Sequence, residues 1–174
     1  KVCTPFYDAM SIGYHYVLPE DVEIILDNNG IPSFSWKSDN WIINRVPDIE
    51  IPIPPYHHPI CFTFRIMFGI DLPKGSSAIL TQPMNRNDLP FTIPSGIVDA
   101  DIKFFPLDIR FFLKRGVEGI IKKGTPIIQV IPFTRESWKM EVDDNILEEK
   151  MWLHEKRRTM LSSWYTKNAY SKKE

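Results

Sequence analysis

Two carboxylates, Asp99 and Asp101, follow directly after a short apolar run in the segment SGIVDADI. The Gly-Ile-Val run is typical of a strand that ends in a tight turn, where a carboxylate can face a cleft and accept a proton from water. Asp99 is therefore the candidate general base. Alternatively, both side chains are turn residues that accept hydrogen bonds from their own backbone. The residues alone leave both interpretations open.

A basic side chain, Arg86, lies in the segment NRNDLPF and could hold a phosphate together with Asn85. Asp88 stands two residues further on and offers Arg86 an ion-pair partner within one turn. We predict the Arg86–Asp88 ion pair and keep phosphate binding as the alternative. The basic run of residues 156–158 is interpreted as a solvated helix face, with phosphate contact as its alternative.

The adjacent histidines His57 and His58 are the candidate metal ligands. Neighbouring residues of an extended segment point to opposite faces, and no carboxylate has a spacing that would complete a site, so we predict no metal centre here. The two cysteines, Cys3 and Cys61, lack metal-like spacing and are expected to be free thiols, with Cys61 buried and inert. The five tryptophans are expected to pack in the core or at a subunit interface.

Composition favours a mainly β protein. The chain has 174 residues with 15 prolines, which interrupt helices, and its formal charge of −1 gives no general attraction to nucleic acid or membranes. No apolar run approaches the roughly 20 residues of a membrane span, and the first residues lack a signal-peptide core. We expect a cytoplasmic protein, in the host cytoplasm if viral, for which nucleic acid is an unlikely partner.

Short apolar runs separated by Pro, Gly, Asn and Asp predict ten strands. They cover residues 14–18, 22–26, 31–36, 41–45, 61–68, 79–81, 97–98, 109–113, 119–121 and 127–131. Residues 27–30, Asp-Asn-Asn-Gly, predict a hairpin turn. The five prolines of residues 46–59 exclude a central strand there and favour an extended connection.

The composition changes after Phe133, because residues 134–174 contain neither proline nor glycine. Apolar residues at helical spacing predict a C-terminal helix from about Asp144 to Tyr165. We therefore expect a β domain over residues 1–135 and a helical extension over residues 136–174. The extension is expected to pack on that domain or on a neighbouring subunit.

Two segments carry a resemblance to a known superfamily. The run SGIVDADI fits the motif G-[VI]-[IV]-D-x-D-Y, and KKGTPIIQVIPF fits K-x-G-x-x-[IV]-x-Q-[LV], and in this order they resemble the dUTPase and dCTP deaminase superfamily. Upstream, Gly13 and Tyr14 are in register with a G-S-A-G-Y-D-L segment. The matching residues of the two motifs are Gly96, Ile97, Val98, Asp99, Asp101, Gly124, Ile127, Gln129 and Val130.

The resemblance implies a β-clip or distorted jelly-roll fold, a trimer and a nucleotide ligand. In that family the residue matching Asp99 activates the attacking water, while Mg²⁺ and basic side chains hold the triphosphate. Carried over to this chain, the catalytic residue is Asp99, and the substrate-binding residues are Asn85, Arg86, Asp101 and Gln129. No metal-ligating residue is assigned.

Several positions depart from the family pattern. The tyrosine that stacks on the sugar is Ile102, the acidic residue of the first motif is His15, and the catalytic glutamate of the deaminase branch falls at Ile109, next to Asp108. The Arg-Ser pair aligns with residues 83–84, and the glycine-rich closing arm is missing. We therefore predict a non-catalytic protein that binds a ligand or a partner, or forms a structural oligomer. The alternative is a Mg²⁺-dependent deoxynucleoside triphosphate pyrophosphatase with Asp99 as general base.

The chain also resembles uncharacterised phage and bacterial proteins that share the motifs NRxDLPF and KGTPIxQVIPFxRxxW. This second resemblance implies no function.

Overall fold

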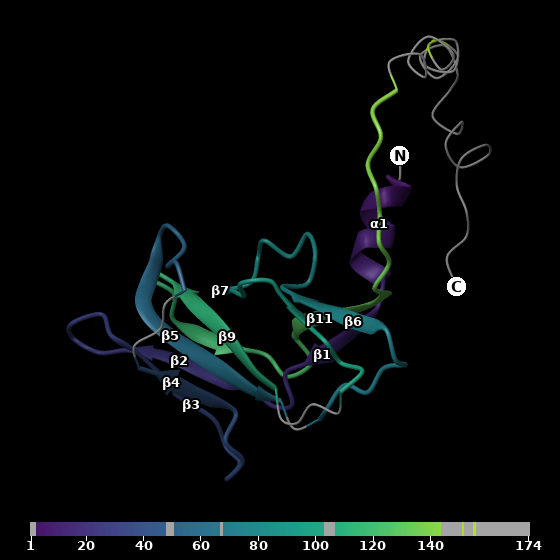
Figure 1. Ribbon diagram of the computed structural model, residues 1–174. Coiled ribbons are helices and arrows are strands. Elements are labelled where there is room, and N and C mark those ends of the chain that lie inside the picture. Colours follow the sequence, from purple (N-terminus) through teal and green to yellow (C-terminus); the bar gives the residue numbers. More distant parts are fainter. Residues whose placement is uncertain are drawn as a thin grey trace. The chain divides into compact units, whose positions relative to one another are not determined.

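The computed structural model describes residues 3–47, 51–66, 68–102, 107–143, 151 and 155. The chain divides into two units, one of residues Met10–Arg135 and one that combines Lys1–Ala9 with Glu136–Glu174. The described residues form eleven strands and one short helix, α1 (Thr4–Ser11), which confirms a mainly β protein (Figure 1). Within this described part, no helix is long and apolar enough to cross a membrane.

The strands form three antiparallel sheets within Met10–Arg135. The first sheet has the order β1 (Tyr14–Val17), β11 (Pro126–Thr134), β6 (Ser76–Thr81) and β8 (Gly96–Val98). The second has the order β10 (Gly119–Ile121), β2 (Val22–Leu26) and β3 (Pro32–Ser35). The third has the order β4 (Ile43–Val46), β5 (His57–Ile66), β9 (Leu107–Lys114) and β7 (Phe91–Thr92).

A group of phenylalanines joins the second sheet to the third. Phe64 and Phe111, on β5 and β9, stack with ring centroids 4.1 Å apart, and Phe34 of β3 meets Phe62 edge-on at 4.9 Å. Phe64 and Phe111 are fully buried, and full burial of such a side chain stabilises a fold by roughly 1.5–3 kcal/mol. Branched residues of the first sheet, including Leu80 and Ile128, belong to the same buried cluster.

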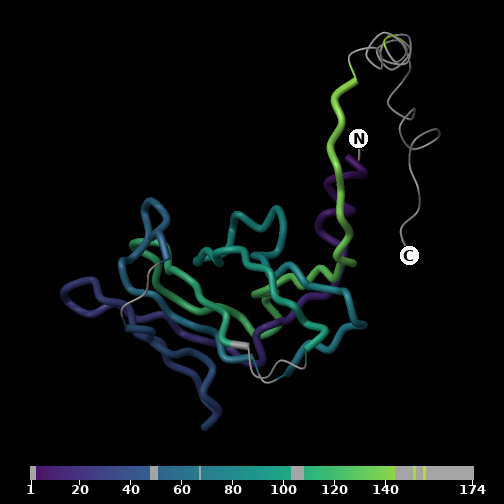
Figure 2. Tube along the Cα trace, viewed as in Figure 1, coloured from purple at the N-terminus to yellow at the C-terminus, as the bar shows by residue number. Residues whose placement is uncertain are grey.

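Each predicted strand overlaps an observed one, with ends that differ by a few residues. The turn between β2 and β3 is the predicted one, because the Asp27 carboxylate accepts hydrogen bonds from the Asn29 and Ile31 amides. Figure 2 traces this turn and the loop of residues 36–42 at the two ends of β3. The helix predicted over residues 144–165 lies outside the described residues, apart from Met151 and Glu155.

Three features differ from expectation or were not predicted. Strand β5 begins at His57 and includes Pro59, so the proline-rich segment does contribute to a central strand. Its pairing with β9 is irregular between His57 and Cys61, and a proline without an amide hydrogen is accommodated where the hydrogen-bond ladder is interrupted. Helix α1 and the two-residue strand β7 were not predicted, because each is too short for a clear hydrophobic period.

Gly13 lies at the start of β1 against the neighbouring strand. Its φ of +74° belongs to the left-handed region, and a Cβ placed on it would lie 2.1 Å from the Val130 carbonyl oxygen. No side chain fits at that distance without moving backbone. Close approach of β1 to β11 therefore requires glycine at position 13.

Gly13→Ala should lower the free energy of unfolding by about 2 kcal/mol or more, because it adds a steric clash to an unfavourable backbone conformation. The matched control is Gly30→Ala, since Gly30 has a similar φ of +72° but no heavy atom within 4 Å of an added Cβ. The control should lose only about 1 kcal/mol. Urea unfolding measures both, and equal losses would show that the contact with Val130 does not matter.

Candidate functional site

Asp99 and Asp101 lie just beyond β8, at the edge of the first sheet. Strand β8 pairs with β6 so that Val98 is opposite Ala78, which places Asp99 beside Ser77. The Ser77 hydroxyl, itself buried, donates a hydrogen bond of 2.7 Å to the Asp99 Oδ1 atom. Asp99 is thus held at one oxygen by the neighbouring strand, while its side chain stays 65% exposed.

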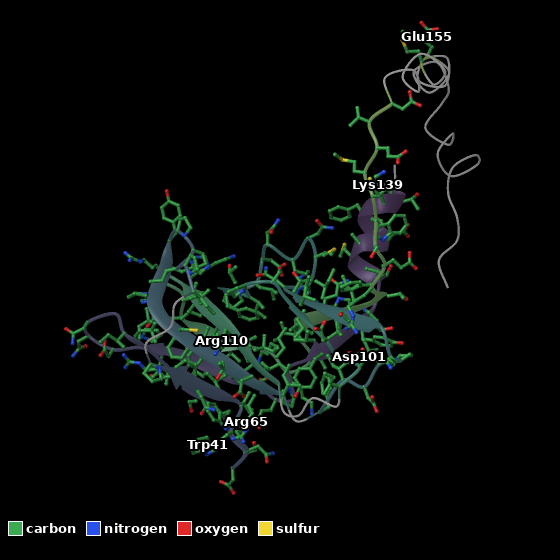
Figure 3. All side chains as sticks on the ribbon, in the orientation of Figure 1. Trp41, Arg65, Asp101, Arg110, Lys139 and Glu155 are labelled. Carbon is green, nitrogen blue, oxygen red and sulfur yellow. The ribbon has the colours of Figure 1, made fainter. Side chains whose placement is uncertain are left out.

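Arg135, the residue after β11, connects the two carboxylates. Its Nη1 atom lies 3.1 Å from Asp99 Oδ1 and 3.3 Å from Asp101 Oδ1, and its Nη2 atom donates to Asp101 Oδ2. Asp101 Oδ2 also accepts a hydrogen bond of 2.9 Å from the Gly75 amide. The Arg135 amide in turn donates to the Gly75 carbonyl at 2.8 Å. We call this group, Gly75, Ser77, Asp99, Asp101 and Arg135, the arginine clamp (Asp101 is labelled in Figure 3).

The clamp changes the pKa values of Asp101 and Arg135. Hydrogen bonds from Arg135, and then from the Gly75 amide, lower the pKa of Asp101 from 3.8 to about 2. The same hydrogen bonds to Asp101 raise the pKa of Arg135. Asp101 is thus a carboxylate at neutral pH, and its side chain is only 9% exposed. Both its oxygens accept hydrogen bonds from donors of the protein itself.

Asn85 and Arg86, the candidate phosphate ligands, do not join the clamp. The Arg86 guanidinium forms a two-pronged ion pair with Asp88, in which Nε and Nη2 each lie 2.8 Å from a carboxylate oxygen. This contact is the predicted one. Asn85 adopts a φ of +64°, which asparagine tolerates better than most residues, and so serves the turn between β6 and β7. Arg86 lines a hollow with residues of β10 and Lys122.

Gln129, the remaining candidate ligand, is fully buried in β11. Its Nε2 atom donates to the Ile12 carbonyl, and its Oε1 atom accepts from the Met84 amide, at 2.8 and 2.9 Å. The side chain thereby fixes the entry to β1 and the loop that carries Asn85 and Arg86. These two hydrogen bonds are with backbone groups, a geometry suited to a residue that positions two loops.

Within the described residues, His57, Cys3 and Cys61 form no hydrogen bond with a member of the clamp, and each has surroundings of its own. His57 is buried, with its ring nitrogens 2.8 Å from the Pro55 carbonyl and 2.9 Å from the Thr92 hydroxyl. Cys3 is exposed and Cys61 buried, both with free thiols, and burial raises the pKa of Cys61. Over the described ranges, no three His, Cys, Asp or Glu side chains gather in a way that could hold a metal ion.

A cavity of about 420 Å³ lies between the first and third sheets. Its lining is mostly apolar and includes Leu80, Ile109 and Ile128, while Ser95, Asp108 and Arg110 contribute polar groups. Ile109 is buried and Asp108 is exposed, as expected for neighbours along a strand. We call this space the inter-sheet cavity.

Arg135 and Ser77 were not among the predicted site residues. The available signal for Arg135 was its place in the shared motif KGTPIxQVIPFxRxxW, where it follows the strand that contains Gln129. Nothing in that motif says which carboxylates the arginine meets, because the pairing depends on β11 and β8 lying on either side of β6. Ser77 lies in no motif that could have identified it as a site residue.

Replacing Arg135 should change the acid sensitivity of the fold. The folded pKa of Asp101 is about 2, below the unfolded value near 4, so this carboxylate stabilises the fold above about pH 4 and loses that contribution as pH falls through about 2. The urea midpoint of the wild type should therefore fall more steeply than that of Arg135→Met between about pH 5 and pH 2.

The matched control is Lys139→Met, because Lys139 pairs with Glu141 at 3.1 Å on the surface and outside the clamp. This control should keep the steep wild-type profile. Other carboxylates with lowered pKa values, such as Asp21 and Asp88, contribute equally to all three proteins. Parallel profiles for the wild type and Arg135→Met would show that Arg135 does not hold Asp101 in solution.

Comparison with known proteins gives no relative from which a role could be carried over. No protein-family model matches the chain, and no curated protein matches it. The superfamily resemblance therefore depends on the motif residues themselves. What the chain does has to be argued from the geometry of the clamp and the cavity.

Proposed function

We propose that this chain is a non-catalytic protein with a dUTPase-like β-clip, or distorted jelly-roll, fold that binds a small ligand and acts as an oligomer. One observation carries the proposal. Arg135 forms ion pairs with both Asp99 and Asp101, the two carboxylates that the resemblance assigns to catalysis and substrate binding. The acidic pair serves to join the end of β11 to the segment that follows β8.

The ion pairs are unfavourable for hydrolysis. A general base needs a lone pair directed at the attacking water, and Asp99 Oδ1 already accepts from Ser77 and Arg135. A magnesium ion would have to compete with the guanidinium for Asp99 Oδ1 and for both oxygens of Asp101. The Arg86 charge is engaged by Asp88, and Ile102, at the position of the family's stacking tyrosine, is 73% exposed.

The inter-sheet cavity supports a ligand-binding role. Its volume of about 420 Å³ suits a small molecule, because ligand pockets commonly span about 300–1,000 Å³. An apolar floor with Ser95, Asp108 and Arg110 at polar positions suits a flat ring with hydrogen-bonding edges, such as a nucleobase. Nucleotide binding without turnover is therefore the form of the proposal that we favour.

The exposed edges of the first sheet support an oligomer. Ile97 on the edge strand β8 is 66% exposed, and Tyr14 on the opposite edge strand β1 is 72% exposed. Exposed apolar side chains on sheet edges are a liability that a subunit contact removes. We propose a trimer, by analogy with the superfamily. Light scattering that gives the mass of one chain at micromolar concentration would exclude it.

The alternative is a deoxynucleoside triphosphate pyrophosphatase of the cytoplasm. Asp99 would act as the general base, Mg²⁺ would bridge the phosphates, and the four residues Asn85, Arg86, Asp101 and Gln129 would surround the substrate. The exposure of the Asp99 side chain favours it. It requires Arg135 to release at least one carboxylate when the substrate binds.

The wild type should release no phosphate or pyrophosphate above background from dUTP, dCTP, dATP, dGTP or dTTP with Mg²⁺. Asp99→Asn serves as the matched control, because it keeps the shape of the side chain and removes its charge. Turnover by the wild type that Asp99→Asn abolishes would establish the alternative. Calorimetric titration with the same nucleotides measures binding, and Ser95→Trp, which narrows the inter-sheet cavity, should weaken it.

A further inference from the structure

A second hollow lies where the loop after β3 meets the end of β5. It has a volume of about 460 Å³ and is lined by Asp39, Asn40, Trp41 and Arg65. Figure 3 shows Trp41 and Arg65 close together and well separated from Asp101 of the arginine clamp. We call this hollow the Trp41 pocket. Among the described residues, the linings of this pocket and of the inter-sheet cavity have no member in common.

The loop that presents Trp41 is held by hydrogen bonds within the loop and by hydrogen bonds to Glu20, which lies between β1 and β2. The Glu20 carboxylate accepts hydrogen bonds of 3.0 Å from the amides of Lys37 and Ser38, and it also accepts from the Ser38 hydroxyl. The Trp36 indole donates to the Asn40 carbonyl at 2.7 Å. These bonds fix the backbone on both sides of Asp39 before any ligand arrives, which lowers the entropy cost of binding.

Trp41 does not pack in the core, and the subunit interface that was the other expectation for the tryptophans stays a prediction. Its side chain is 65% exposed, while Trp36 on the same loop packs against the buried cluster. Most exposed apolar residues need no explanation. A large aromatic ring that a fixed loop presents beside a charged side chain is a different case, because tryptophan offers both an apolar face and a hydrogen-bond donor to a ligand.

The charges of the pocket are not used inside the protein. Within the described part of the chain, neither the Arg65 guanidinium nor the Asp39 carboxylate forms an ion pair or a side-chain hydrogen bond. Asp108 is the cross-strand neighbour of Arg65, and it forms no ion pair with it either. Among its described lining residues, the pocket therefore offers a guanidinium, a carboxylate and the Asn40 carboxamide to a ligand, that is, one positive and one negative charge.

We propose that the Trp41 pocket binds a pyranose ring of a neutral carbohydrate. The C–H groups on one face of such a ring carry partial positive charge and suit the negative face of the indole. Vicinal hydroxyls can donate to Asp39 and accept from Arg65, and Asn40 can do both. Each planar polar side chain can bind two neighbouring hydroxyls at once.

The charge balance argues against the other ligand classes. A phosphate or an acidic sugar would pair with Arg65 but would be repelled by Asp39. A purely apolar ligand would desolvate both charges without giving them partners, which is unfavourable. A neutral ligand with many hydroxyls satisfies both charges together. The open form of the hollow suits a ring at the protein surface.

The test is a glycan array of neutral and acidic oligosaccharides, probed with the labelled full-length chain. We expect binding to neutral glycans. Calorimetry with the best neutral glycan should then show that Trp41→Ala weakens affinity by about tenfold or more, and that Asp39→Asn weakens it as well. Trp138→Ala is the matched control, because Trp138 is 87% exposed and lies outside Met10–Arg135. It should leave affinity unchanged.

Trp41 is exposed, so its replacement should preserve the fold, and an unchanged circular dichroism spectrum verifies this. Three outcomes overturn the proposal: no binding to any neutral glycan, binding to acidic glycans only, or binding that Trp41→Ala leaves intact. None of these outcomes depends on nucleotide turnover or on the inter-sheet cavity.

Discussion

The guanidinium of Arg135 joins three segments that are far apart in the sequence. It meets Asp99 and Asp101 after β8, while the Arg135 amide donates a hydrogen bond to the Gly75 carbonyl just before β6. The first sheet is ordered β1, β11, β6 and β8, so one side chain at the end of β11 reaches across β6 to the edge strand. This contact adds to the pairing of β8 with β6 in holding the edge strand, which contributes Gly96 and Val98 to the wall of the inter-sheet cavity.

The ion pairs with Arg135 affect what the carboxylates can do chemically. Carboxylates that complete an ion pair inside the fold are stabilised as anions, and their oxygens are directed at protein donors. Asp101 shows this most clearly, with a pKa of about 2 and two donors on one oxygen. A Gly-Ile-Val-Asp turn can therefore occur in a β fold in which its carboxylates stabilise the structure. Such a motif indicates the fold more directly than it indicates a reaction.

The sequence predicts local features of this fold better than it predicts the site. Turn residues such as Asp27 and Gly30 act through neighbours a few positions away, so the hairpin between β2 and β3 follows from its own sequence. The Arg86–Asp88 ion pair is equally local. The contacts of Arg135 with Asp99 and of Gln129 with Ile12 join residues that are far apart in the sequence, and only the order of the strands brings them together. Strand β5 was mispredicted at Pro59 for the same reason, because the irregular pairing that tolerates proline depends on β9.

The charged residues that the structure describes fall into two groups. Those with an ion-pair partner inside the protein stabilise the fold, and those without one can bind a ligand. Arg86 pairs with Asp88, Lys122 with Asp21, and Arg135 with two acids. By contrast, Asp108 and Arg110 border the inter-sheet cavity, and Asp39 and Arg65 border the Trp41 pocket, without such partners in the described part of the chain. Arg65 is half-buried, whereas Asp39, Asp108 and Arg110 are exposed, so these charged groups are open to solvent and to a ligand. The two hollows therefore offer charges to a ligand, as proposed above, while both carboxylates of the clamp are paired with Arg135 and the Asp99 side chain stays 65% exposed.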